Sequence, residues 1–81
     1  MKVLVKLYAT LREYAPANTD IGSSFEVDLD GTTLEELIHQ LGFDVDIAKI
    51  VMINGDRVLD MSINLNENDL VVIFPPLGGG Q

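Results

Sequence analysis

The chain has 81 residues, of which 47% are hydrophobic, 13 are acidic and five are basic, and it contains no cysteine. This length suits one domain, the apolar content exceeds that of a disordered acidic tail, and the lack of cysteine excludes disulfides, thiolate metal sites and thiol nucleophiles. The net charge of -8 disfavours nucleic acid and anionic lipid and favours a basic protein partner. Apolar runs of at most five residues are too short for a membrane span or an export signal, so we expect a cytoplasmic protein.

The first quarter of the chain alternates apolar and polar residues. In residues 2–10, Val3, Val5, Leu7 and Ala9 share one face, and the face that carries the lysines is the wetter one. A polar stretch follows, and residues 25–29 alternate again. The pattern predicts two strands joined as a wide hairpin.

The next segment has the spacing of an amphipathic helix. Its apolar stripe consists of Leu34, Leu37, Ile38 and Leu41. Thr32 followed by Glu35 predicts a capping box at the start, and Gly42 predicts the end. We expect a helix of about three turns.

The second half of the chain predicts three more strands. Residues 43–49 are ambiguous between a short helix and a loop, whereas residues 50–53 read as a buried strand, followed by an Asn54-Gly55 turn and a short return strand at 57–59. Residues 70–74 are apolar on both faces, which indicates a central strand. The element order predicts an α+β roll, with the helix packed on one face of the sheet.

No side chain predicts a self-contained active site or metal site. His39 lies off the apolar stripe of the helix and is expected to face solvent. Residues 28–31 resemble the start of a calcium loop, but the glycine at the sixth position and the glutamate at the twelfth are missing. Asp44 and Asp46 are too few for a hard cation. We therefore expect no metal, no cofactor bound by the protein itself and no catalysis of its own.

The C-terminal end combines a stiff exit with a run of glycines. Pro75 and Pro76 end the last strand and hold the chain extended, whereas residues 78–80 lack a Cβ and fit a channel too narrow for other residues. Residues 75–80 reach about 20 Å. We expect a domain at residues 1–76 and a flexible tail at 77–81 that enters a partner.

Three segments of the chain resemble the small subunit of molybdopterin synthase, in the ubiquitin-like sulfur-carrier family. They are residues 8–13 (YATLRE), 52–56 (MINGD) and 69–79 (DLVVIFPPLGG). The resemblance spans essentially the whole chain. It implies the ubiquitin-like β-grasp fold, a mixed sheet of four to five strands with one main helix on one face, in agreement with the element order.

The resemblance also implies a function for the tail. In this family a ubiquitin-activating-like adenylyltransferase uses ATP to adenylate the terminal glycine, here Gly79 or Gly80, which is then converted to a thiocarboxylate. The large subunit of molybdopterin synthase next receives the tail, and the sulfur passes to the pterin precursor of the molybdenum or tungsten cofactor. Adenylation gives the carboxylate a leaving group, and the thioacid sulfur is a good nucleophile.

The resemblance further assigns residues that contact the partner. Tyr8 and Phe74 match aromatic residues that the family exposes for docking, and Arg12 matches its polar docking residue. Pro75, Pro76, Leu77 and Gly78 form the stem of the tail. Alternation alone leaves open whether Tyr8 and Phe74 belong to the core and whether Arg12 is only a solvated charge.

The chain departs from the family at its end, because Gln81 follows the glycines. Either a protease removes Gln81 before activation, or the chain as written is not a working sulfur donor. Two other functions stay open: a ubiquitin-like modifier or carrier for another pathway, such as lysine conjugation or tRNA thiolation, and an interaction domain whose tail is never activated. The first strand lacks the early Asn-Gly turn that is typical of the thiamine carrier, which disfavours a role in thiamine synthesis. We expect a monomer alone and a heteromer with the partner.

Overall fold

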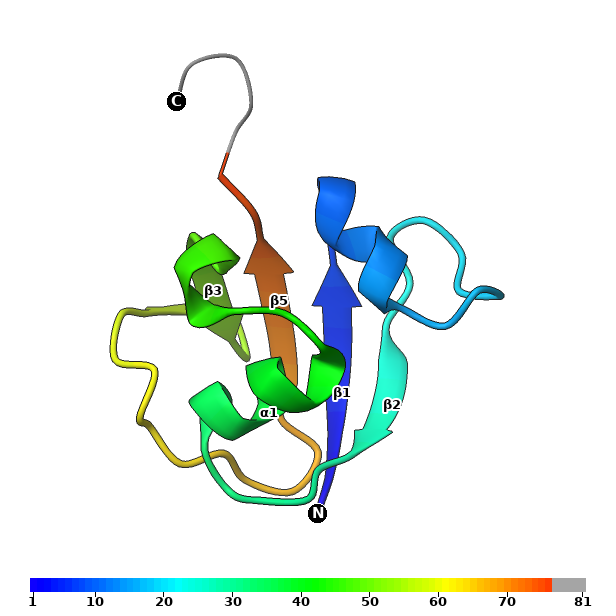
Figure 1. The fold of residues 1–81 in the computed structure, drawn as a ribbon. Helices are drawn as coiled ribbons and strands as arrows, with labels where there is room; N and C mark the ends of the chain where they lie inside the picture. Colours follow the sequence, from blue (N-terminus) through cyan, green and yellow to red (C-terminus); the bar gives the residue numbers. More distant parts are fainter. Residues whose placement is uncertain (77–81) are drawn as a thin grey trace.

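The computed structural model describes residues 1–76, which form one mixed five-stranded sheet and one main helix (Figure 1). The elements are β1 (Lys2–Leu7), η1 (Ala9–Tyr14), β2 (Phe25–Asp28), α1 (Leu34–Leu41), η2 (Val45–Ile47), β3 (Ile50–Ile53), β4 (Asp56–Val58) and β5 (Leu70–Phe74). This arrangement confirms the predicted β-grasp roll. The predicted tail at 77–81 lies outside the described residues, so its boundary at residue 76 stays a prediction.

The sheet has the strand order β2-β1-β5-β3-β4, with β1 and β5 parallel and every other neighbouring pair antiparallel. Alternation places Val5 and Leu7 of β1 beside Val71 and Ile73 of β5 on the inner face of the sheet. All four are buried in the same core cluster as the apolar stripe of α1, of which Leu37 is fully buried. The predicted packing of the helix against β1 is therefore confirmed, as is the central position of β5.

The first predicted strand is too long. β1 ends at Leu7, and residues 9–14 form the 3-10 helix η1, so Ala9 does not continue the buried face but is exposed. Ala9 has a φ of 54°, which turns the chain out of the strand. Leu11 of η1 is only 1% exposed, so this turn caps one end of the core with a leucine.

The predicted capping box is wrong by one residue. The N-cap is Thr33, whose hydroxyl accepts from the backbone N–H of Glu36, and the Glu36 carboxylate accepts from the backbone N–H of Thr33 at 2.9 Å. Leu34 is fully buried and its N–H is bonded to Ile63, so the helix begins there and is eight residues long instead of about three turns. The predicted ending at Gly42 is confirmed, since its φ is 111°.

Hydrogen bonds from the backbone at Thr32 and Thr33 lower the pKa of the Glu36 carboxyl group, because they stabilise its charged form. The negative charge of Glu36 also lies in the first turn of α1, where it interacts favourably with the positive end of the helix dipole. The start of α1 is thus fixed by a threonine and a glutamate that act together.

Substitution of Thr33 by alanine is expected to lower the free energy of unfolding by about 1 kcal/mol, because the helix loses its N-cap. Thr32→Ala is the matched control, since it removes only a 3.5 Å hydroxyl contact with Asn64, and it should have a smaller effect. Urea denaturation of both variants measures the difference. A larger loss for Thr32→Ala would place the N-cap at Thr32.

The Asn-Gly turn ties β3 to the start of β5. Asn54 and Gly55 have φ angles of 52° and 90° and form the two-residue connection between β3 and β4. The Asn54 side-chain N–H donates to Asp69 Oδ1 at 2.8 Å, and its Oδ1 accepts from the Leu70 N–H at 2.9 Å. The other Asp69 oxygen accepts from the backbone N–H of Asn66 at 2.8 Å. The motif therefore serves both as a turn and as an anchor for β5.

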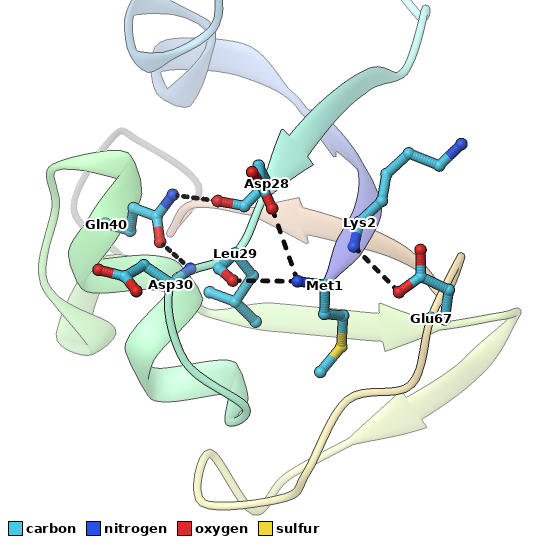
Figure 2. A network of polar contacts seen from close by, with 7 residues as sticks. All are labelled: Met1, Lys2, Asp28, Leu29, Asp30, Gln40 and Glu67. Atoms are coloured by element: carbon cyan, nitrogen blue, oxygen red, sulfur yellow. Dashed lines mark hydrogen bonds and ion pairs between the residues drawn. The ribbon is translucent and has the colours of Figure 1, made fainter.

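A polar network holds the N-terminal end of β1 near the helix (Figure 2). The Met1 ammonium lies 3.5 Å from Asp28 Oδ1 and donates to the Leu29 carbonyl. Gln40, near the end of α1, donates to the Asp28 carbonyl and accepts from the Asp30 N–H. This end of the sheet is opposite the end at which β5 leads into Pro75, because β1 and β5 run parallel (Figure 1).

Candidate docking face and tail exit

The sheet face opposite α1 has a centre of half-exposed apolar side chains. We call this central part the open face, and it comprises Leu4, Lys6, Tyr8, Ile50, Met52, Arg57, Leu70, Val72 and Phe74; Lys2, Glu26 and Asp28 lie beside it on the same side of the sheet. Within the open face, Arg57 is exposed and the other residues are of intermediate exposure. The register forms one row from Lys6 through Val72 and Met52 to Arg57.

Two aromatic rings stand at the end of the open face where the chain leaves β5. Tyr8 and Phe74 are stacked, with ring centroids 4.7 Å apart and an interplanar angle of 10°. The Tyr8 N–H donates to the Ile73 carbonyl, and the Lys49 N–H donates to the Phe74 carbonyl at 2.9 Å. Bonds from both neighbouring segments thus fix the direction in which β5 continues into Pro75, which is buried.

Tyr8 and Phe74 lie outside the buried core cluster, so the alternative of ordinary core residues is wrong for both. The structure brings together two of the three residues predicted to dock. Their role in docking stays a prediction, because an exposed position alone does not identify a partner.

The third predicted docking residue is held by its own chain. Arg12 lies in η1 and is half-buried, and its guanidinium donates to the Thr19 carbonyl at 3.4 Å. It therefore braces the loop between η1 and β2. Leu77, Gly78, Gly79 and Gly80 lie outside the described residues.

Sequence reasoning missed most of the open face. Its additional members on the central strands are Leu4, Ile50, Met52, Leu70 and Val72. The strands that are apolar on both faces indicated that a second apolar surface exists. Deciding which of their residues lie opposite the helix, however, requires the register of three strands. Arg57 was missed because a single arginine on a short strand has no pattern of its own.

The described residues do not assemble acid-base or metal chemistry on this face. Within residues 1–76, no group of three or more His, Cys, Asp or Glu side chains is placed to hold a metal ion. Asp44, one of the acidic pair near η2, caps that turn by accepting from the Asp46 N–H. His39 is exposed on α1, on the other side of the sheet. The geometry suits the binding of a protein surface beside the tail exit.

Two further observations bear on the surface of the described part. Hydrogen bonds from the hydroxyl and the backbone N–H of Ser62 lower the pKa of the Asp60 carboxyl group, because they stabilise its charged form. In residues 1–76, no helix has the length and apolar character needed to cross a bilayer.

Three solved structures are similar in fold. A putative molybdopterin converting factor, subunit 1, from Pyrococcus furiosus is 26% identical, with a TM-score of 0.64 over 94% of this chain and 98% of that chain. SAMP1 from Haloferax volcanii is 24% identical, with a TM-score of 0.64 over 99% and 100%. In a complex of subunits 1 and 2 of the molybdopterin-converting factor from Helicobacter pylori 26695, the matching chain is 17% identical. Its TM-score is 0.60 over 99% of this chain and 100% of that chain. The last two show the fold alone.

No curated protein matches the sequence. The model of the ThiS family matches residues 5–80, which is nearly the whole chain and includes the open face apart from Leu4 as well as the three glycines at 78–80. The protein therefore belongs to the ThiS family, as a small β-grasp chain of the type that serves as a sulfur carrier or a ubiquitin-like modifier.

Proposed function

We propose that this protein is the sulfur carrier of a molybdopterin synthase. The observation that carries the proposal is the continuity of the open face with the tail, because the Tyr8–Phe74 stack stands where β5 leads into Pro75, Pro76 and the glycines. The similarity to the Pyrococcus furiosus subunit 1, over 94% of this chain, supports the molybdopterin pathway.

The partner enzyme supplies the chemistry. The carboxylate of the terminal glycine, Gly79 or Gly80, attacks the α-phosphorus of ATP, which forms an acyl adenylate and releases pyrophosphate. A sulfide donor then displaces AMP and leaves a thiocarboxylate. In a large synthase subunit this sulfur bonds to a carbon of the pterin precursor and displaces an oxygen substituent. Water then cleaves the resulting thioester, which leaves the sulfur on the pterin and restores the glycine carboxylate. The chain itself docks, presents the tail and keeps its exit direction fixed.

A ubiquitin-like modifier is the second candidate. A second structure, of small archaeal modifier protein 1 from H. volcanii, is 26% identical over 94% of this chain, and a modifier needs the same adenylation. The two candidates differ only in what attacks the activated glycine: a lysine amine forms an amide, whereas sulfide forms the thiocarboxylate.

Mass spectrometry of the intact protein, purified from its own cells, tests the proposal. The expected spectrum shows loss of Gln81 and replacement of one oxygen by sulfur at the new terminus. Two recombinant chains, one ending at Gly80 and one at Gln81, are then offered to the adenylyltransferase of the same cells with ATP. Only the chain ending at Gly80 should be adenylated.

A variant truncated after Leu77 is the control and should stay unmodified in both assays. An unmodified full-length chain in cells, together with no adenylation of the chain ending at Gly80, would contradict the proposed function. Conjugates on lysine without a thiocarboxylate would favour the modifier.

A further inference from the structure

The open face carries positive charge, although the protein as a whole is strongly acidic. Only five of the 81 residues are basic, yet Lys6 and Arg57 both lie in the row that crosses the middle of this face. The acidic residues on this side of the sheet lie beside the open face on the edge strand β2, where Glu26 is 3.8 Å from Lys2 and Asp28 lies beside the N-terminus. The charge at the centre is thus opposite in sign to that of the molecule.

Neither of these two cations forms an ion pair with a residue of the described part of the chain. The ion pairs of residues 1–76 join Met1 to Asp28 and Lys2 to Glu26, and none includes Lys6 or Arg57. The side chains of Lys6 and Arg57 also make no hydrogen bond to a described residue, in contrast to Arg12. Both charges are therefore available for a partner, and Val72 and Met52 separate them.

The register fixes the spacing of the cations. Lys6 and Arg57 are three strand intervals apart, across β1, β5, β3 and β4, so their backbones lie about 14 Å apart. Between them the face offers two apolar side chains. A complementary surface has an apolar ridge over Val72 and Met52 and a carboxylate at each end, within reach of the Lys6 and Arg57 side chains.

We propose that Lys6 and Arg57 bind two carboxylates that flank an apolar ridge on the enzyme that activates the tail. This inference rests on the proposed function and names the chemistry of its partner surface. Val72 is two residues, about 7 Å, before Phe74 at the tail exit, so an enzyme that holds the tail covers this row. Charge pairs that are desolvated in an interface contribute to specificity and slow dissociation.

The occupant differs from the uniformly basic partner that the net charge alone suggests. A net charge of -8 favours a basic rim that steers the encounter, whereas the central row requires carboxylates. A second copy of this chain does not fit, because it would bring like net charges together. A surface with a basic rim and two central carboxylates rejects proteins that are basic throughout.

The experiment compares the double variant Lys6→Gln/Arg57→Gln with the control Ala17→Asp/Asn18→Asp. Both lower the formal charge by two, but Ala17 and Asn18 are exposed in the loop between η1 and β2, outside the residues that pair β1 with β2. Binding to the adenylyltransferase of the same cells is measured by calorimetry at low and at physiological salt. The cation variant is expected to bind about 10-fold or more weakly at both salt concentrations, and the control to differ little from the unmodified sequence at physiological salt.

The outcomes distinguish a failure of the inference from a failure of the proposed function. If the unmodified sequence binds and is adenylated but the two double variants have equal affinities, the cation pair is overturned and the proposed function stands. If the unmodified sequence neither binds nor is adenylated, the proposed function and the inference both fail. A shift from dimer to monomer in the cation variant alone, measured by sedimentation, would make a second copy the occupant and overturn the inference.

Discussion

Replacement of Ile73 by alanine is expected to lower the free energy of unfolding by about 4 kcal/mol. Ile73 is 0% exposed on the central strand β5, where it pairs with Leu7 of β1 and Val51 of β3 on the inner face. The truncation removes buried methyl groups and leaves a cavity between the sheet and α1, which cannot close without moving both layers.

Val72→Ala is the matched control, because Val72 is the preceding residue of β5 but lies on the open face. It is half-exposed, so its truncation should cost about 1 kcal/mol or less. Chemical denaturation monitored by circular dichroism compares the two variants. If Val72→Ala lowers the free energy of unfolding as much as Ile73→Ala or more, the assignment of Ile73 to the inner face and Val72 to the open face is wrong.

Asp69→Ala should lower the free energy of unfolding by about 3 kcal/mol. Asp69 is the one polar residue buried among residues 1–76, at 8% exposure, and its two oxygens accept from Asn54 and Asn66. Alanine removes two hydrogen bonds to a charged, buried carboxylate, and each such bond contributes about 1.5 kcal/mol or more. Thermal and urea unfolding measure the loss.

Glu67→Ala is the control for this effect. Glu67 is exposed and accepts one 3.2 Å hydrogen bond from the backbone N–H of Lys2, so its removal should cost well below 1 kcal/mol. Asp69→Asn adds a second test, because its amide replaces an acceptor by a donor and meets one of the two N–H groups unfavourably. Equal stability of Asp69→Ala and Glu67→Ala would show that the Asn54 anchor does not hold β5.

The fold could be predicted wherever a periodic pattern coincided with burial. Val3, Val5 and the stripe of α1 repeat at the periods of a strand and a helix, and the apolar run at 70–74 fixed β5 to the residue. The end of β1 could not be predicted, because Ala9 continues the alternation and only its positive φ breaks the strand. The predicted N-cap was wrong by one residue because the sequence offers two pairs with the same spacing, Thr32 with Glu35 and Thr33 with Glu36.

The candidate site was predictable in part. The motifs at both ends of the chain identified Tyr8 and Phe74, and the structure stacks their rings. Arg12 matched a docking position by its place in the motif, whereas its contact with Thr19 depends on how the following loop folds back. Arg57 reaches the open face through the register of β4 on β3, which local sequence does not encode.

The parallel pairing of β1 with β5 also affects how the protein is made. The two central strands come from opposite ends of the described chain, so the middle of the sheet closes only after β5 has been synthesised and has left the ribosome. Contacts between such distant segments slow folding, and a chain that stops before residue 70 lacks the strand that joins β1 to β3. An incomplete translation product that lacks β5 is therefore expected not to fold.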